Sequence, residues 1–448
     1  MTRINKTKYL VIGNSAGGIG AIEAIRETDS DGAITVISDE PYPAYSRPLI
    51  SEYLASHYPL ERMLYRLPEF YEKNNVQTFL GENVAKVNFN ERSVILESGK
   101  TITWQKLLLA TGGLPIIPRL EGTGSQGVFT FNKFDDARAI DEFLNRCGSC
   151  PRAVVIGGGL IGVSVTEALV KRGVEVTIVE MKERILNTIL DEEASALEAE
   201  ALTRSGVSII TDHTADRINS YATGEVRGIA LDDGRSIPCE MVILAIGVQP
   251  RLEIVAGNDI EINRGIVVDH FMATSAPEVY ACGDVAEAYD FVYGVNRLTP
   301  IWPNAYTGGR IAGLNMAGVS TKYEGGTAMN AMKCFGIHIL SAGMPTPPDD
   351  SYETIGERHD DIYKKVILKN GLITGMIFAG DIEKAGIIYH LMKDGVDVSN
   401  FKEALVADDF GLASLPEEIW QARLAILTPD LEPLVTTVEE PEEVVVDE

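Results

Sequence analysis

Short apolar runs alternate with helical patterns along the first half of this chain. Residues 8–28 predict a strand, a glycine-rich turn and a helix, and residues 33–38 predict a second strand. The same succession returns at residues 152–180. Strands that are apolar throughout and separated by helices are typical of parallel sheets, because helices cover both faces of such a sheet. The pattern therefore predicts an α/β protein that uses one Rossmann-like unit twice.

The rest of the apolar pattern outlines the segments between and after these units. We expect helices up to about residue 75, then, in chain order, weaker β structure at 76–103, a buried strand at 107–113, a helix at 135–146, a helix and a meander at 181–237, a strand at 241–247, two short strands at 265–286 and a helix at 303–317. Past Gly325 the pattern changes to glycine-punctuated strands, clearest at 363–380, followed by helices. This change predicts a separate third domain of the α+β class.

Length and charge narrow the classes of function. A chain of 448 residues is too long for one simple core, so two or three domains are expected. The formal net charge of −26 argues against nucleic acid or an anionic membrane as the main partner. The sequence has no run of 18 apolar residues, so we expect no membrane span. Residues 428–448 have no usable period and are rich in acids, which predicts a disordered acidic tail.

Cysteine usage and the first residues favour a cytoplasmic protein. The five cysteines are an odd number, which fits a reducing compartment. The apolar run before Gly13 is only four residues long and is not followed by a small-residue cleavage site, so we interpret it as a strand and not as a secretion signal.

The second repeat carries a complete dinucleotide-binding fingerprint, AVVIGGGLIGVSV at 153–165. Gly157 allows the tight turn, Gly159 lets the backbone approach a pyrophosphate, and Gly162 lets the helix pack close to the strand. Glu180 ends the following strand, 18 residues after Gly162. A carboxylate there hydrogen-bonds ribose hydroxyls and repels a 2′-phosphate, which predicts NAD and not NADP.

The first repeat, LVIGNSAGGIGA at 10–21, is less complete. Gly13 and Gly18 fit the fingerprint, but Ser15 stands where the middle glycine belongs and narrows the approach to a phosphate; Gly17 is expected to relieve this. The acid at the end of the next strand is Asp39 or Glu40, and strand register favours Asp39. Two dinucleotides on one chain suggest that electrons pass between them.

Further segments carry a resemblance to a known family. They are PYPAYSRPLIS (41–51), LLLATGGLP (107–115), VILAIGVQP (242–250) and VYACGDVAEA (279–288). With the two fingerprints, they resemble the pyridine nucleotide–disulfide oxidoreductase superfamily over roughly residues 7–320. The resemblance implies FAD at the first fingerprint and NAD(H) in an inserted second domain. The implied division is 1–119 with 248–322 for FAD, 120–247 for NAD, and 323–427 for a C-terminal α+β interface domain.

The resemblance also implies roles for matched residues. Asp284 would accept a hydrogen bond from the flavin ribityl chain, and Gly247 would border the nicotinamide. Trp302 and Asn304 would lie at the pyrimidine edge of the flavin. The remaining residues implied to bind FAD are Gly13, Ser15, Ala16, Gly17, Gly18, Asp39, Glu40, Arg47, Pro48, Val84, Ala110, Thr111, Gly112 and Gly283. Those implied to bind NAD are Gly157, Gly159, Leu160, Ile161, Gly162 and Glu180.

Missing residues separate this chain from the disulfide reductases of the superfamily. Those enzymes carry a redox cysteine near the segment 41–51, where this chain has Tyr45, Ser46 and Arg47. Without a thiolate, electrons cannot be relayed from flavin to a disulfide. The Cys147-Gly-Ser-Cys150 sequence is interpreted as an inert surface turn, Cys239 and Cys334 as buried small residues, and no His or Cys spacing predicts a metal site.

The expected function is FAD-dependent transfer of electrons from NADH to an acceptor, without a catalytic side chain. The segment 41–51 is similar to that of NADH-dependent rubredoxin, ferredoxin and nitrite reductases, although Glu52 and Ser164 depart from the ferredoxin-reductase pattern. We expect a small iron–sulfur carrier or an iron–sulfur subunit as acceptor, docked on a basic patch for which Arg62, Arg66 and Arg119 are candidates. Either a homodimer or a subunit of a complex fits. An NADH oxidase and a non-catalytic docking flavoprotein are the alternatives.

Overall fold

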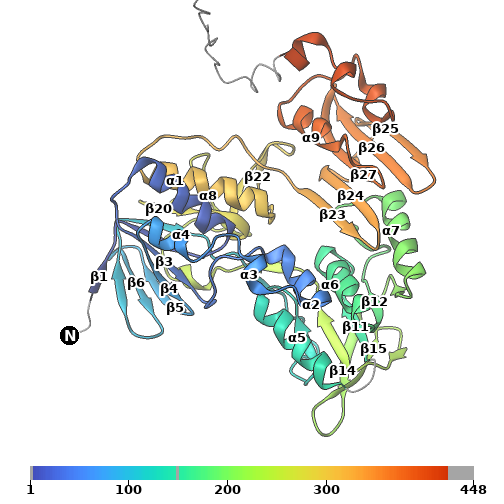
Figure 1. The fold of residues 1–448 in the computed structure, drawn as a ribbon, viewed down its shortest axis with the longest axis horizontal. Coiled ribbons are helices and arrows are strands. Elements are labelled where there is room, and N and C mark those ends of the chain that lie inside the picture. Colours follow the sequence, from blue (N-terminus) through green and yellow to red (C-terminus); the bar gives the residue numbers. More distant parts are fainter. Residues whose placement is uncertain (1–3, 148–150, 422–448) are drawn as a thin grey trace, which may run out of the picture.

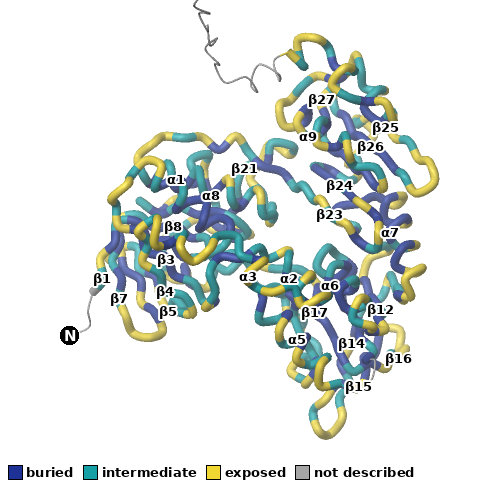
Figure 2. Tube along the Cα trace, in the orientation of Figure 1, coloured by how far each residue is buried: buried dark blue, intermediate teal, exposed yellow. Residues whose placement is uncertain are grey.

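The structure is a computed structural model that describes residues 4–147 and 151–421 as three bodies (Figure 1). The first and second bodies each contain a five-stranded parallel sheet, and the third contains a five-stranded antiparallel sheet. In Figure 2 the central strands of each body are buried, while exposed residues gather in the loops. The expected α/β architecture is confirmed. Cys150 and the predicted acidic tail at 428–448 lie outside the described residues.

The first body is built around a parallel sheet whose apolar strands are largely buried. In spatial order its strands are β20 (Val279–Ala281), β8 (Lys106–Leu109), β2 (Tyr9–Ile12), β3 (Ile34–Ser38) and β4 (Val76–Leu80). Two helices, α1 (Ala16–Thr28) and α8 (Trp302–Met316), pack together against this sheet. A four-stranded sheet shares the same hydrophobic core and consists of β1 (Ile4–Lys6), β7 (Thr101–Thr103), β6 (Ser93–Leu96) and β5 (Val84–Asn88).

Glycines let α1 and α8 approach each other at backbone distance. A Cβ on Gly309 of α8 would lie 2.0 Å from the carbonyl oxygen of Gly17. One turn further along, a Cβ on Gly313 would lie 2.5 Å from the carbonyl oxygen of Ala21. No side chain fits at either distance, because the atom that it would meet is rigid backbone. The spacing of the two helices, and with it the position of the α1 N-terminus, therefore depends on these glycines.

The second body repeats the parallel architecture. Its strands in spatial order are β10 (Val128–Thr130), β17 (Met241–Leu244), β11 (Arg152–Ile156), β12 (Glu175–Val179) and β13 (Ser208–Ile210). Three helices share a core with this sheet: α5 (Phe134–Arg146), α6 (Leu160–Lys171) and α7 (Glu192–Arg204). A second core lies between the sheet and the antiparallel strands β14 (Ala215–Ser220), β15 (Val226–Leu231) and β16 (Ser236–Ile237). These strands are the meander that the sequence predicts.

The chain crosses between the first two bodies twice, at one place. Strand β9 (Gly113–Pro115) leaves the first body and β18 (Val248–Pro250) returns to it, and the two pair antiparallel. The second body is therefore an insertion in the first. One segment of the first body packs on the second: Tyr45, α2 (Ile50–Ser56) and α3 (Leu60–Met63) contribute buried residues to the core of the second body. This segment of the first body thus packs against the second body.

The third body is an antiparallel sheet with one long helix. Its strands in spatial order are β23 (Met329–Cys334), β24 (Ile337–Gly343), β27 (Leu372–Ala379), β26 (Ile362–Lys369) and β25 (Glu353–His359), and the helix is α9 (Ala385–Lys393). One face of the sheet packs on α9, and the other packs on the second body. There Asp191, the N-cap of α7, accepts hydrogen bonds from Tyr363 at 2.6 Å and from Lys365 at 2.7 Å.

Several short elements are the least predictable part of the fold. They include β21 (Ala286–Asp290) and β22 (Val295–Arg297), whereas α4 (Glu69–Lys73) and β19 (Ile266–Val267) fall where a helix and a short strand were expected. The strands β1 and β10, of three residues each, were not expected from the sequence, because three residues are too few to show a period. Among the described residues, no helix has both the length and the apolar character that crossing a membrane requires.

Replacing Gly309 by alanine should destabilise the protein by about 1–3 kcal/mol, since the new methyl group overpacks against the backbone of Gly17. The matched control is Gly386→Ala in α9, where a Cβ meets nothing within 4 Å. That change should stabilise the protein by about 0.5–1 kcal/mol, because alanine is the better helix former. Urea unfolding of both variants checks the pair, and equal effects would contradict the packing argument.

Candidate functional site

One large cavity of about 610 Å³ lies where the three bodies meet. Each of the three contributes to its wall. Of the residues implied by sequence, the following line it: Gly13, Ser15, Ala16, Gly17, Asp39, Glu40, Arg47, Pro48, Ala110, Thr111, Gly112, Leu160, Ile161, Gly283, Asp284 and Trp302. Chain segments nearly 290 residues apart in sequence therefore meet at one site. The others lie outside this lining: Gly18, Val84, Gly157, Gly159, Gly162, Glu180, Gly247 and Asn304.

The first glycine-rich loop brings the N-terminus of α1 to the cavity. Gly13 has φ +121°, and a Cβ there would lie 2.0 Å from the carbonyl oxygen of Ala110. Ser15 is the N-cap of α1, and its side chain makes no capping hydrogen bond. The free amides of a helix N-terminus favour an anion such as a pyrophosphate. Gly18 supports this indirectly, because a Cβ on it would lie 2.0 Å from the carbonyl oxygen of Gly13.

Gly17 has a packing role of its own, and the relief it was expected to give at Ser15 stays a prediction. A Cβ on Gly17 would lie 2.7 Å from the Sγ atom of Cys282, so its missing side chain makes room for the loop at Cys282. The same loop carries Gly283 and Asp284 into the cavity wall. Burial raises the pKa of the Asp284 carboxyl, and the positive charge of Arg47 opposes this shift. A partner that donates a hydrogen bond to Asp284 would therefore be favoured.

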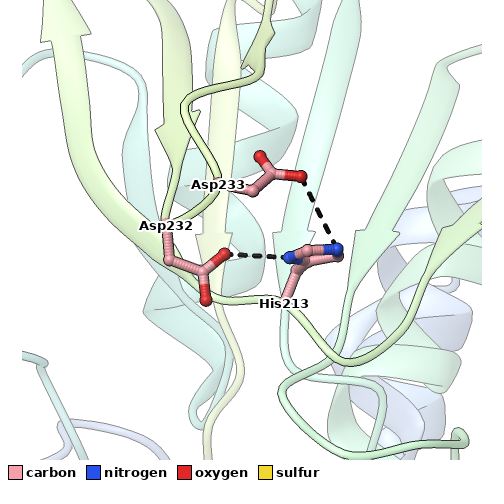
Figure 3. A group of neighbouring side chains, drawn as sticks. All are labelled: His213, Asp232 and Asp233. Atoms are coloured by element: carbon pink, nitrogen blue, oxygen red, sulfur yellow. Dashed lines mark hydrogen bonds and ion pairs between the residues drawn. The ribbon is translucent and has the colours of Figure 1, made fainter.

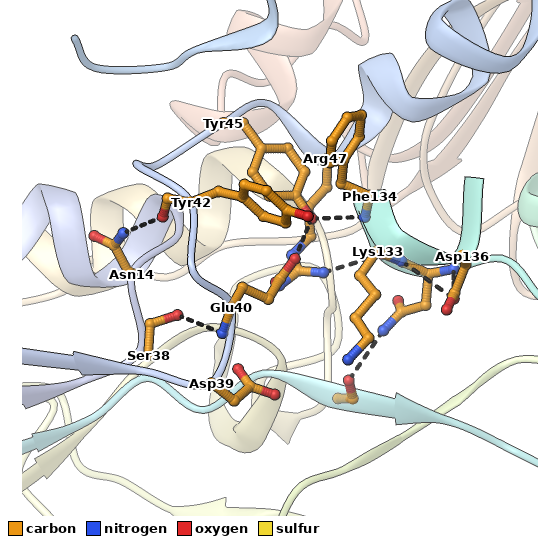
Figure 4. A network of polar contacts seen from close by, with 12 residues as sticks. Asn14, Ser38, Asp39, Glu40, Tyr42, Tyr45, Arg47, Lys133, Phe134 and Asp136 are labelled. Carbon is orange, nitrogen blue, oxygen red and sulfur yellow. Dashed lines mark hydrogen bonds and ion pairs between the residues drawn. The ribbon is translucent and has the colours of Figure 1, made fainter. Parts of the chain in front are cut away.

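The two acids after β3 have different surroundings. The carboxylate of Asp39 is half-exposed and lies 3.0 Å from Nη1 of Arg251. Glu40 is buried, and its carboxylate is held by Arg47 and by the hydroxyl of Tyr45 at 2.6 Å (Figure 4). The accessible acid is thus Asp39, the one favoured by strand register. Sequence reasoning missed Arg251 because no motif marks a residue that follows the second chain crossing.

Trp302 and Asn304 begin the same helix but differ in role. Trp302 lines the cavity and packs edge to face on Tyr65, with ring centroids 5.1 Å apart. The amide nitrogen of Asn304 instead donates to the carbonyl oxygen of Thr327 at 3.1 Å. Asn304 therefore anchors the segment that leads to β23, and its place at a flavin edge stays a prediction.

The second glycine-rich loop has the geometry that its fingerprint predicts, outside the large cavity. Gly157 has φ +109°, and a Cβ on Gly162 would lie 1.9 Å from the carbonyl oxygen of Gly157. A Cβ on Gly159, the N-cap of α6, would meet nothing within 4 Å, which leaves room for a ligand at that amide. Glu180 accepts hydrogen bonds from the backbone N–H of Gly158 at 2.6 Å and of Lys182 at 2.9 Å.

Two other implied residues lie away from the large cavity. Val84 lies in β5 and packs against the core of the first body. Gly247, with φ +112°, sits between β17 and β18 at the chain crossing, and the nearest atom to a Cβ there would be on Ile116 at 3.9 Å. Neither lies in the lining of the large cavity.

Strand β23 of the third body lines the cavity, which no sequence motif indicated. Residues 329–334 contribute to the wall, and among them Cys334 is buried. Cys282 is a second thiol in the lining. Burial raises the pKa of Cys282 to about 12, and burial together with Glu198 and Glu167 raises the pKa of Cys334. Both thiols are thus held neutral, a state that is a poor nucleophile.

A surface group on the second body was not anticipated from the sequence. His213 lies 3.0 Å from Asp232 through Nδ1 and 3.6 Å from Asp233 through Nε2 (Figure 3). Its members are about twenty residues apart, so their spacing gave no signal. Arg235 also pairs with Asp233. The group is largely exposed, and the contacts present account for its charges without a metal ion.

Comparisons with known proteins identify the family. Residues 7–309 match the family described as pyridine nucleotide-disulphide oxidoreductase, and residues 329–396 match the rubredoxin NAD+ reductase C-terminal domain. A nitrite reductase [NAD(P)H] of Bacillus subtilis (strain 168) is 29% identical over 88% of this chain. The chain spans about half of that relative's length, 48%. The epsilon subunit of the NADH-dependent phenylglyoxylate dehydrogenase of Aromatoleum evansii is 29% identical over 93% of this chain and 99% of its own length.

Solved structures show the same fold. The NADH:rubredoxin oxidoreductase of Clostridium acetobutylicum has a TM-score of 0.72 and is 28% identical, covering 88% of this chain and 97% of its own. A ferredoxin reductase of Rhodopseudomonas palustris has a TM-score of 0.82 at 21% identity, covering 91% of this chain and 99% of its own. The second likeness concerns the fold alone.

Glu198 of α7 generates a prediction about pH. It is 0% exposed, neither carboxyl oxygen has a hydrogen-bond partner, and burial raises its pKa from 4.5 to about 7. Between these values the native carboxyl keeps a proton that the unfolded chain has released. Stability should therefore fall as pH rises from about 4.5 to 7, by at most about 1.4 kcal/mol per pH unit, and then level off.

Glu198→Gln keeps the shape of this side chain and removes its titration. The variant should not lose stability between pH 5 and pH 8 through this group. The difference in unfolding free energy between the variant and the original protein should therefore shift in favour of the variant as the pH rises. Unfolding free energies measured across this range check the expectation. Glu200→Gln, on the exposed face of the same helix, is the matched control. Parallel profiles for Glu198→Gln and the original protein would contradict it.

Proposed function

This chain belongs to the pyridine nucleotide-disulphide oxidoreductase family, and on that premise we propose that it is an FAD-dependent NADH:acceptor oxidoreductase. Its electrons go to a small iron–sulfur protein or to an iron–sulfur subunit. The observation that carries this proposal is the large cavity, which is lined by the first glycine-rich loop and by the start of the helix after the second, and whose lining thiols are both held neutral. Neutral thiols leave electron transfer from flavin to an external acceptor as the favoured chemistry.

The first loop and its surroundings support FAD as the resident cofactor. The α1 N-terminus at Ser15 is suited to a pyrophosphate, Asp39 to a ribose, and Asp284 to a polyol chain. The cavity of about 610 Å³ is large enough for much of a dinucleotide. We keep the division of residues 1–119 with 248–322 for FAD, 120–247 for NAD and 323–427 for the interface domain as part of the proposal.

The side chains act by orienting the two dinucleotides and not by acid–base chemistry. FAD, when bound, would supply both the acceptor for a hydride and the capacity to release single electrons. The protein binds the two dinucleotides at its helix N-termini and fixes their relative position. Trp302, Ile161 and Leu160 line the cavity and exclude water from it. No residue is assigned a catalytic proton transfer.

The sequences of the relatives support an iron–sulfur acceptor. The C-terminal match is to a domain of rubredoxin NAD+ reductase, and a relative of full length is a subunit of an NADH-dependent dehydrogenase. The likeness to that dehydrogenase subunit favours the alternative that this chain is a subunit of a larger complex and does not act on a free carrier. An NADH oxidase remains the competing activity, since an NADH oxidase of Methanocaldococcus jannaschii is 30% identical over 70% of this chain. A cytoplasmic location is part of the proposal, because NADH is the reductant.

The basic patch suggested for docking is weaker than the sequence implied. Arg66 pairs with Glu23 at 2.7 Å, so much of its charge is already neutralised. Arg62 stacks over the ring of Tyr58, and Arg119 is exposed. We retain Arg62 and Arg119 as candidates for contact with an acidic carrier.

Anaerobic titration of the FAD-loaded protein with NADH tests the proposal. The flavin should bleach with one equivalent of NADH and recover when an oxidised rubredoxin or ferredoxin is added. Fast oxygen consumption without a carrier would instead identify an oxidase. A flavin that NADH does not bleach would leave only a docking role.

Glu180→Arg should weaken NADH binding and improve NADPH binding, each by roughly tenfold or more, because a guanidinium attracts the 2′-phosphate that a carboxylate repels. Dissociation constants for both nucleotides check this. The substitution also removes the acceptor of the Gly158 N–H, so Glu180→Gln, which keeps an acceptor there, is the control. An unchanged preference in the arginine variant would remove Glu180 from the nucleotide site.

A further inference from the structure

The hydroxyl of Tyr45 lies between the two dinucleotide-binding bodies. It donates a hydrogen bond to Oε2 of Glu40 at 2.6 Å and accepts one from the backbone N–H of Phe134 at 2.9 Å (Figure 4). Glu40 follows β3 of the first body, and Phe134 is the first residue of α5 in the second. Tyr45 is only 5% exposed, and burial raises the pKa of its hydroxyl, so it keeps its proton as a donor.

A second series of polar contacts, through Arg47, links Glu40 to the start of α5. The other oxygen of the Glu40 carboxylate is held by Arg47, and Nη1 of Arg47 donates to the carbonyl oxygen of Asn132 at 3.0 Å. Glu40 is 6% exposed, so this carboxylate is shielded from water and its hydrogen bonds are correspondingly strong. Glu40 therefore reaches the start of α5 twice, through Tyr45 to the Phe134 amide and through Arg47 to the Asn132 carbonyl.

Aromatic side chains pack around the contacts that link Glu40, Tyr45 and Arg47 to Asn132 and Phe134, which we call the polar tie. The ring of Phe134 lies 4.8 Å from that of Tyr53, 5.2 Å from that of Tyr42 and 6.1 Å from that of Tyr45, measured between centroids. All three tyrosines belong to the segment that reaches from the first body over the second. The contact supplies apolar area and fixes ring orientations, while the hydrogen bonds fix the direction of approach.

The tie forms part of the cavity wall. Glu40, Tyr45, Arg47 and Asn132 all line the cavity. The two glycine-rich loops stand on different bodies, which the chain connects covalently at the crossing of β9 and β18. Hydride transfer requires the two rings to be held at a defined distance and angle, so the angle between the bodies controls its rate.

We propose that Tyr45 is a positioning residue for hydride transfer, whose hydroxyl fixes the angle at which the NAD-binding body faces the flavin-binding body. This inference rests on the proposed function. Tyr45 acts through Glu40 and through the N-terminus of α5, and it takes no part in the chemistry. Sequence comparison with disulfide reductases drew attention to this position only because a cysteine is absent from the segment.

The test is Tyr45→Phe in the FAD-loaded full chain, which keeps the ring and removes both hydrogen bonds. Rapid anaerobic mixing with NADH should give flavin reduction roughly tenfold slower at saturating NADH, with little change in the NADH concentration at half-saturation. The long-wavelength absorbance of nicotinamide stacked on flavin should weaken. Flavin content and reduction by dithionite should stay as in the original protein, and amide hydrogen exchange at the start of α5 should quicken.

Tyr53→Phe is the matched control, since Tyr53 contacts the same ring of Phe134 and its hydroxyl is not part of the tie. It should reduce at the original rate. Tyr45→Phe overturns the inference if its reduction rate and its α5 exchange both equal those of the original protein, or if it loses FAD, which would assign Tyr45 to flavin binding. If NADH fails to bleach the original protein, the proposed function falls, while hydrogen exchange still decides whether Tyr45 joins the bodies.

Discussion

Close backbone approach around the N-terminus of α1 is the constraint on which the rest of this structure depends. Gly13 lies against the carbonyl of Ala110, Gly18 against that of Gly13, and Gly309 against that of Gly17, each at a distance that excludes a side chain. These contacts place the free amides of α1 at the cavity wall and bring the loop with Asp284 beside them. An anion site made in this way consists of main chain, and it is rigid because the helices cannot separate without losing their packing.

Burial of charge organises the region between the bodies. The Glu40 carboxylate lies in a low-dielectric wall, where an unpaired charge would be costly, and its partners Arg47 and Tyr45 both extend to the second body. These partners belong to the first body, and their other hydrogen bonds, to the Asn132 carbonyl and the Phe134 amide, join the two bodies. At Asp191 a buried carboxylate is itself satisfied across an interface, because the third body supplies Tyr363 and Lys365. Polar groups that can be satisfied only across an interface make the relative placement of the bodies specific.

The protonation state of two buried thiols limits the chemistry of the cavity. Cys282 and Cys334 stand in the wall, yet burial raises the pKa of each thiol, so neither is prepared to act as a thiolate. A family member with this wall is left with its dinucleotides as the electron-carrying groups. The third body adds β23 to the wall of the cavity.

The sequence by itself determined the two parallel sheets, their glycine-rich turns and the α+β class of the third body, because apolar period and glycine spacing are local signals. The insertion of the second body was implied by the family resemblance. Together with that resemblance, the sequence also named 16 of the 40 residues of the cavity wall. Only the tertiary structure decided that Gly17 serves packing, that Asn304 anchors the chain to the third body, that Asp39 pairs with Arg251, and that Tyr45 joins two bodies. Those roles depend on atoms brought together from distant parts of the chain, and no local pattern of residues records such a meeting.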